Sequence, residues 1–247
     1  MRAPVDTIEA PPFPRGLEWV NVAPLRMDKQ LGRPVLVEFW DFCRVHSLRT
    51  LPYVREWHRR YADQGLRVIG VHSPGFAPSA DERAAREAVA RLEIAHPVVL
   101  DQRLEVWELY GNEGWPARYL FDQRGVLHEV HFGEGGYAET ERAVQELLGS
   151  ERPLVAPLRP EDEPGALLAV PTEDQPGAYS GPYEAGGVWA VAEGEGTLVA
   201  NGREVAVGHP GCHPLIEHDR HTAGELELSV PSDVACHAVC FTAGLAA

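Results

Sequence analysis

Residues 42–47, FCRVHS, combine a thiol with two basic side chains at a point where an apolar strand gives way to a helical pattern. Cys43 is the thiol, and Arg44 and His46 follow it. A helix N-terminus carries a partial positive charge and free N–H groups, which stabilise the nucleophilic thiolate. Arg44 and a protonated His46 would add to this effect. The segment therefore predicts a reactive thiol that works through a sulfenic acid or through a mixed disulfide resolved by an outside thiol.

A structural interpretation of Cys43 stays open beside the catalytic one. Cys43 can be the last inward residue of a buried strand, where cysteine acts as a small apolar filler. The other three cysteines, Cys212, Cys236 and Cys240, lie far along the chain, so the sequence contains neither a C-x-x-C pair nor a disulfide framework. Any dithiol chemistry at this segment would need a partner from outside it.

Two further residues of the preceding strand could belong to the same site. Glu38 interrupts the apolar run VLVEFW, where an acid is costly unless it is paired or used, although it could also be a strand-end carboxylate that faces solvent. Trp40 is a candidate shelf for a substrate, and a core tryptophan is the alternative.

The elements that must position these residues alternate between strand and helix from about residue 17 to 148. Apolar residues recur every three or four positions from Leu48 to Tyr61, which predicts a helix containing Pro52. Ser79 and Glu82 have the spacing of a capping box. Further helices are expected near 104–111 and 137–148, and strands at 17–22, 34–40, 66–73, 96–101, 117–122 and 126–132. This order is typical of a partly parallel sheet, so residues 1–150 are predicted to form an α/β domain.

The composition changes after residue 150. Six prolines between residues 149 and 177 disfavour a long helix, so 151–177 is predicted to be a linker or arm. Residues 178–247 contain short β-rich runs, and Asn201-Gly202 is a strong hairpin signal. We expect a small all-β sandwich, jelly-roll-like, in this region. Cys236 and Cys240 are four residues apart on one predicted strand and should point the same way.

Charge and hydropathy exclude several classes of partner. The chain has 22 Lys and Arg against 37 Asp and Glu, a net charge of −15, which repels nucleic acid and anionic membranes. No apolar run is long enough for a membrane span, and the N-terminus lacks the apolar core of a signal peptide. We therefore expect a cytoplasmic protein without nucleic-acid or membrane partners.

A cluster of histidines in the second half offers candidate metal ligands. The run HPGCHPLIEHDRH offers imidazole and thiol groups, which bind zinc, iron or copper. It contains no H-x-H pair of the kind found in cupins, and Pro214 interrupts the candidate strand. We expect no metal site and no cofactor. The potential ligands in this run are His209, Cys212, His213, His218 and His221.

The first half resembles a known family. The strings PVLVEFWDFCRVHSLRTLPYV, WPARYLFDQRG and HFGEG are similar to the redoxin (AhpC/TSA-type), thioredoxin-like domain at the C-terminal end of DipZ-type thiol-disulfide proteins, over residues 17 to 148. In the ungapped register, the two redox cysteines of the family fall on Arg44 and Ser47. Pro52 then matches the helix-kinking proline of thioredoxins. A one-residue slip would instead make Cys43 the nucleophile.

The resemblance also implies a thioredoxin fold and roles for neighbouring residues. Glu38 resembles the buried acid that thioredoxins keep beneath the second cysteine as a proton acceptor. Trp115-Pro116 precedes a strand, where thioredoxin folds keep a cis-proline that holds an extended substrate. That family also continues into a β-sandwich module similar to carbohydrate-binding domains. The implied substrate-binding residues are Trp40, Trp115 and Pro116.

Two functions follow from these observations, and whether the chain is an enzyme stays open. The first is a single-cysteine thiol oxidoreductase or peroxidase-like enzyme acting on a thiol or disulfide substrate, although the T-x-x-C arrangement of peroxiredoxins is missing. The alternative is a non-catalytic module that binds a peptide or protein after losing its dithiol. The candidate catalytic residues are Cys43, Arg44, His46, Ser47 and Glu38.

Overall fold

The computed structural model describes residues 7–246. The chain divides into two units, and each is described by itself. The first unit comprises Met1–Asp41 and His46–Ala156, and the second comprises Phe42–Val45 and Pro157–Ala247. The sequence boundaries of 150 and 178 stay predictions.

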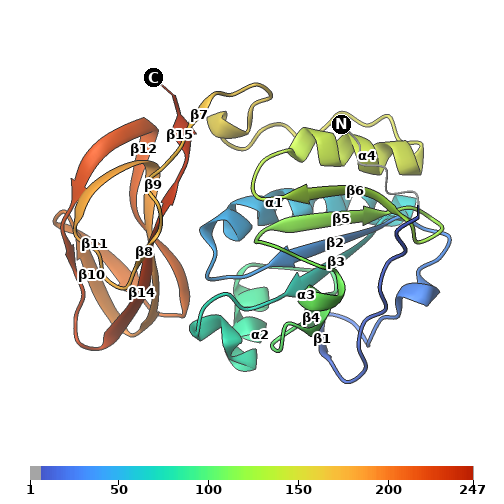
Figure 1. The fold of residues 1–247 in the computed structure, drawn as a ribbon, viewed down its shortest axis with the longest axis horizontal. Coiled ribbons are helices and arrows are strands. Elements are labelled where there is room, and N and C mark those ends of the chain that lie inside the picture. The colour runs from blue at the N-terminus through green and yellow to red at the C-terminus, as the bar shows by residue number, and fades with distance from the viewer. Residues whose placement is uncertain (1–6, 247) are drawn as a thin grey trace. The chain divides into compact units, whose positions relative to one another are not determined.

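The first unit is built on a six-stranded mixed sheet with the strand order β1-β4-β3-β2-β5-β6 (Figure 1). β2, β3 and β4 run parallel, β5 pairs antiparallel with β2, and β6 pairs antiparallel with β5. All six strand predictions are confirmed to within two residues at each end. The strands are β1 Glu18–Val20, β2 Val35–Trp40, β3 Arg67–His72, β4 Val98–Leu100, β5 Ala117–Phe121 and β6 Leu127–Phe132.

Helices cover both faces of this sheet. Leu36, Val54 and Val144 belong to one apolar cluster, which joins β2 to α1 and α4 along one face (Figure 1). Phe39 and Val106 belong to a second cluster on the opposite face, beside α3. The central strand β2 is buried at every position, as expected for a strand covered on both faces. The helices are α1 Val45–Tyr61, α2 Glu82–Arg91, α3 Glu105–Leu109 and α4 Tyr137–Leu148, with 3-10 turns η1 Met27–Lys29, η2 Ala62–Gln64 and η3 Pro78–Ala80.

The predicted capping box at Ser79 is wrong. Asp81 caps α2 instead, because its carboxylate accepts a hydrogen bond from the Ala84 amide at 2.7 Å. The Ser79 hydroxyl donates to the Asp41 carboxylate at 3.1 Å. The Ser79 side chain therefore bonds to Asp41, which is distant in sequence, and does not cap α2.

The second unit is rich in strands, as predicted. A four-stranded sheet has the order β12-β9-β14-β8, and a three-stranded sheet has the order β11-β10-β13. One apolar cluster takes residues from both, including Val188, Phe241 and Leu198. A jelly-roll-like sandwich stays a prediction. The elements are η4 Pro160–Asp162, β7 Leu168–Ala169, β8 Gln175–Pro176, β9 Gly181–Gly194, β10 Gly196–Ala200, β11 Arg203–Val207, β12 Gly211–Leu226, β13 Leu228–Ser229, β14 Val234–Thr242 and β15 Gly244–Leu245.

Local irregularities in this unit correct one expectation. A register shift between Cys236 and Ala238 breaks the alternation of β14. Cys236 therefore packs against the same cluster as Val239 and Phe241, whereas Cys240 lies between those two residues and faces away from it. The two thiols do not point the same way. Across residues 7–246, no helix has the length and apolar character needed to cross a membrane.

Candidate functional site

The predicted site lies at the carboxyl end of β2, where four residues separate this strand from α1. Asp41 organises the turn: its buried carboxylate accepts hydrogen bonds from the Gly75 amide at 2.8 Å and from Ser79. Cys43 follows; it is not in a disulfide, and 0% of its surface is exposed. The predicted nucleophile is therefore buried.

Ser47 and Arg44 differ in their surroundings. Ser47 is fully buried, and its hydroxyl accepts a hydrogen bond from the Asp41 amide at 3.3 Å. Arg44 is half-buried. The Ser47 hydroxyl oxygen therefore stabilises the turn between β2 and α1.

His46 belongs to an ionic cluster that sequence analysis did not foresee. Its Nδ1 lies 2.7 Å from one oxygen of Glu134, and the Arg49 Nε donates to the other oxygen at 2.6 Å. Burial acts to raise the pKa of Glu134, but the hydrogen bond from His46 and the charge of Arg49 outweigh it, so the pKa is lowered. The sequence feature that could have indicated this cluster is Glu134 in the run GEGG. The glycines around it allow the loop to bring Glu134 back to α1. Gly133, Gly135 and Gly136 all have positive φ.

Glu38 is fully buried, so the solvent-facing alternative for this residue is excluded. Its cross-strand neighbour on β5 is Arg118, which is also buried. Burial raises the pKa of Glu38 to about 8 because the charge of Arg118 offsets only part of the desolvation. Neither carboxylate oxygen of Glu38 has a hydrogen-bond partner among residues 7–246. Arg118 was not predicted as the partner of Glu38. A basic residue at an inward position of the run ARYLF could have indicated it.

Arg118 connects this buried pair to the loop that carries Glu134. Its Nη2 donates to the Gly135 carbonyl. Its guanidinium also lies 5.2 Å from the ring centre of Tyr137 and 5.7 Å from that of Trp57. Burial lowers the pKa of Arg118 to about 10. Arg118 thus lies opposite Glu38 and also hydrogen-bonds the loop that carries Glu134.

The prediction that Trp40 forms a substrate shelf is wrong. Its indole is fully buried, with the ring centre 5.1 Å from that of His72. Trp40 lies two residues after Glu38 on β2, so both side chains point to the same inner face. Trp40 is therefore a core residue.

The Trp115–Pro116 bond is cis, as predicted from the resemblance. The Trp115 indole donates to the Ser73 carbonyl at 2.8 Å, which orients its ring. The ring of Trp107 from α3 lies 4.2 Å from it. Trp115 and Trp107 are both half-buried. Trp107 was not predicted, since its approach to Trp115 depends on the loop between α3 and β5.

No metal centre emerges from the part of the chain that the structure describes. Within residues 7–246, no group of three or more His, Cys, Asp or Glu side chains is arranged to hold a metal ion. The rings of His209 and His213 stack with their centres 4.8 Å apart. The Nε2 atom of His213 lies 3.1 Å from the His209 carbonyl oxygen. Both contacts join residues that are four positions apart at the start of β12.

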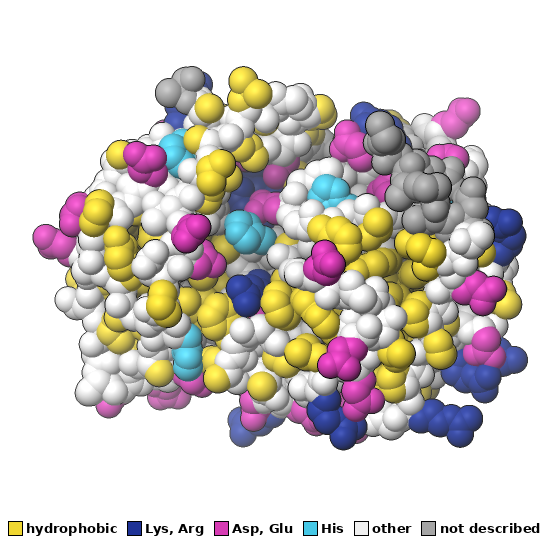
Figure 2. Space-filling view, viewed as in Figure 1, with side chains coloured by type: hydrophobic (Ala, Val, Ile, Leu, Met, Phe, Trp, Pro, Cys, Tyr) yellow, Lys and Arg dark blue, Asp and Glu magenta, His cyan; other side chains and the backbone are white. Residues whose placement is uncertain are grey.

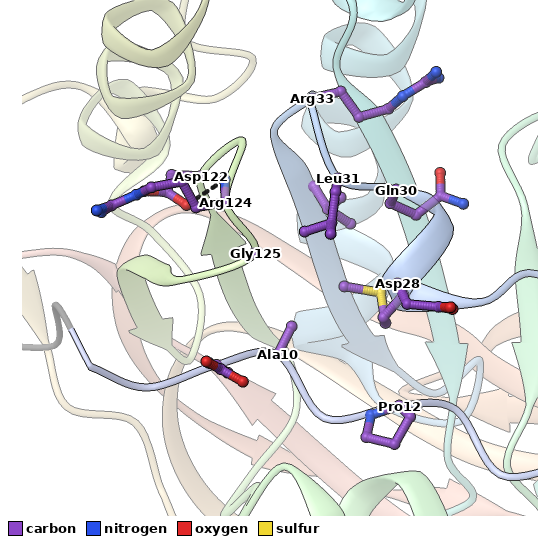
Figure 3. Close-up of a pocket in the computed structure, with 12 residues that line it drawn as sticks. Ala10, Pro12, Asp28, Gln30, Leu31, Arg33, Asp122, Arg124 and Gly125 are labelled. Atoms are coloured by element: carbon purple, nitrogen blue, oxygen red, sulfur yellow. Dashed lines mark hydrogen bonds and ion pairs between the residues drawn. The ribbon is translucent and has the colours of Figure 1, made fainter.

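A separate cavity of about 380 Å³ lies at the opposite end of β2. Met27, Leu31 and Val35 contribute apolar lining. Figure 3 shows the Arg33 and Arg124 side chains directed away from the space between Leu31 and Ala10. It is remote from the turn that carries Cys43 and offers no group for thiol chemistry.

The first unit is similar in sequence to known proteins. The chain is 36% identical over 138 residues to Protein DipZ of Mycobacterium bovis, covering 55% of this chain and 20% of DipZ. It is 29% identical over 130 residues to the thiol-disulfide oxidoreductase YkuV of Bacillus subtilis, covering 53% of this chain and 87% of YkuV. These matches support a redoxin/thioredoxin-like family for the first unit.

A solved structure supports the same assignment of the redoxin-type unit. A thiol-disulfide isomerase of Corynebacterium glutamicum is 25% identical, with a TM-score of 0.51, and the match covers 57% of this chain and 98% of that one. The chain spans about a fifth of the length of the DipZ relative. No family model matches the chain. These relatives support a redoxin-type function for the first unit.

Proposed function

We propose that the redoxin-type unit binds polypeptides that carry thiols or disulfides, without a dithiol cycle of its own. Ser47 carries this proposal: it is buried, and its hydroxyl is engaged by the Asp41 amide. In the register that the resemblance gives, Ser47 stands where the family has its second redox cysteine. A hydroxyl cannot form a disulfide, so this corner would not close one internally.

The class of partner comes from the relatives. YkuV carries the name thiol-disulfide oxidoreductase, and the structural relative from Corynebacterium carries the name thiol-disulfide isomerase. Both names point to thiols or disulfides as the groups on which these two relatives act. A unit that keeps the fold but lacks the second thiol can still recognise such a segment.

Cys43 supports a second candidate, a single-thiol oxidoreductase. It is not in a disulfide and lies two residues before the start of α1. Its thiolate would attack one sulfur of a substrate disulfide, form a mixed disulfide and release the other sulfur as a thiolate. An external thiol would then resolve the mixed disulfide and restore Cys43. The 0% exposure of Cys43 favours the binding function over this cycle.

Alkylation of the native protein separates the two functions. The intact chain is treated with iodoacetamide at neutral and at mildly alkaline pH, and modified cysteines are mapped by mass spectrometry. The half-buried Cys236 is the internal reference. We expect Cys43 to stay unmodified until urea unfolds the chain, because its sulfur is shielded. A Cys43→Ser variant should then bind polypeptide probes as the parent protein does.

Modification of Cys43 in the native protein would favour the single-thiol function. If Cys43 reacts in the native protein before Cys236 does, the thiol is accessible and activated, and the single-thiol cycle replaces the binding function. A mixed disulfide with glutathione at Cys43, seen as a mass increase that dithiothreitol reverses, would support that replacement.

A further inference from the structure

An aromatic surface flanks Pro116 in the redoxin-type unit. Trp107 and Trp115 form a pair with rings 4.2 Å apart and tilted by 37°. The hydrogen bond from the Trp115 indole to the Ser73 carbonyl holds one member of the pair in orientation. Neither ring is fully buried. Two large aromatic rings are therefore fixed at a partly exposed position.

A row of ring contacts through the buried Phe39 and Tyr119 connects Trp107 to Phe132. Trp107 packs against Phe39 at 5.9 Å, Phe39 against Tyr119 at 5.5 Å, and Tyr119 against Phe132 at 5.8 Å. Phe132 is 47% exposed, unusual for a phenylalanine. We name Trp107, Trp115 and Phe132 the aromatic shelf.

Backbone pairing holds Phe132 close to Pro116. In the β5–β6 ladder Phe132 is opposite Ala117, the residue after Pro116. The Gly133 amide donates to the Pro116 carbonyl at 2.7 Å. The two ends of the shelf are thus positioned by a strand ladder and by an anchored indole.

The charge around the shelf is negative. Residues 103–115 contain one arginine and three glutamates. Arg103 pairs with Glu105 at 2.9 Å, whereas Glu108 and Glu113 are exposed and have no ion pair with any residue between 7 and 246. Figure 2 shows hydrophobic side chains at the surface of the first unit, around the region that Figure 1 labels α3, with carboxylate side chains beside them.

We propose that the aromatic shelf docks an extended polypeptide segment in which an aromatic or large aliphatic side chain neighbours lysine or arginine. An apolar side chain would stack on the rings, and aromatic pairs gain free energy beyond the area they bury. A cationic side chain would meet Glu108 and Glu113, and it could also lie over an indole face. This inference rests on the proposed polypeptide binding and specifies its substrate class.

Peptide binding to the full chain tests the inference by fluorescence anisotropy under reducing conditions. Three short fluorescein-labelled peptides each carry one cysteine. The first has phenylalanines flanked by lysines, the second has phenylalanines flanked by glutamates, and the third has alanines flanked by lysines. We expect the first to bind at least about tenfold more tightly than either of the others, with an affinity that falls as salt rises.

Variants assign that preference to the shelf. Glu108→Lys combined with Glu113→Lys should weaken binding of the first peptide about three- to tenfold. The matched control is Glu139→Lys with Glu146→Lys, the same charge change on α4, which packs on the opposite face of the sheet. The control should leave affinity within about twofold. Phe132→Ala removes an exposed ring and should weaken binding about fivefold without unfolding the unit.

The remaining outcomes are distinguishable. Equal binding of all three peptides would leave polypeptide binding standing and overturn the shelf as its specificity surface. An equal effect of the α4 control and the α3-side variant would also overturn it, because the preference would then follow net charge. Binding of none of the peptides would overturn the inference and remove the support for the proposed function as well.

Discussion

Replacing Glu38 by glutamine should change how the stability of the redoxin-type unit depends on pH. Glu38 is fully buried, and neither of its oxygens is hydrogen-bonded among residues 7–246. Burial raises its pKa from about 4.5 to about 8. Glutamine has nearly the same shape but cannot ionise. Comparing the two proteins therefore isolates the proton on this carboxyl group.

The sign and size of this change in the pH dependence of stability follow from proton linkage. Between pH 4.5 and 8 the folded chain keeps the Glu38 proton, whereas the unfolded chain has released it. The contribution of Glu38 to stability is thus fully present below about pH 4.5 and is lost as pH rises through about 8. The slope is about 1.4 kcal/mol per pH unit. From about pH 5.5 to 7.5, the parent should lose about 3 kcal/mol relative to Glu38→Gln.

Urea unfolding at several pH values, followed by tryptophan fluorescence, measures this difference. The result to compare is the free energy of unfolding of Glu38→Gln minus that of the parent, because all other titrations cancel. Glu82→Gln, an exposed acid on α2, is the control and should give a flat difference. A flat difference for Glu38→Gln as well would refute the reasoning. It would mean that Arg118 keeps Glu38 ionised inside the fold throughout this range.

The remaining predictions concern the turn and the ionic cluster beside it. Arg44→Cys with Ser47→Cys should gain disulfide reductase activity in an insulin turbidity assay, because it completes a C-x-x-C pair in the ungapped register. If His46→Cys gains that activity instead, the slipped register with Cys43 as nucleophile is correct. Glu134→Gln should destabilise the unit by about 1–3 kcal/mol at pH 7, because its carboxylate bridges His46 and Arg49. The pKa of Glu134 is lowered in the fold, so this loss should fade as pH falls below about 4. Glu139→Gln removes a carboxylate that makes an exposed ion pair with Arg142 at 3.4 Å, so it should cost under about 0.5 kcal/mol. An equal cost for the Glu134 and Glu139 variants would contradict the bridge.

Local sequence patterns were sufficient for the order of elements. The apolar run in β2 and the helical spacing from Leu48 to Tyr61 located the strand and the helix that flank Cys43. Asn201 and Gly202 both adopt positive φ between β10 and β11, as the predicted hairpin requires. Such patterns are readable because each depends on residues within a few positions of one another.

Only the tertiary structure decided how charged groups in the first unit are paired. Glu134 reaches His46 across 88 positions of sequence, and Arg118 faces Glu38 through the register of β2 against β5. The sequence predicted that Glu38 would be paired or used, but it did not name the partner. Strand register and loop path determine such partners, and neither is encoded in the spacing around the residue itself.

The same distinction applies to burial at the turn. The sequence by itself determined that Cys43 lies between a strand and a helix, a position that suits either a reactive thiol or an apolar filler. The folded chain decided that its thiol is shielded, that Trp40 is a core residue, and that Trp107 joins Trp115 at the surface. Exposure depends on what the rest of the chain packs against a residue, so it is a property of the fold as a whole.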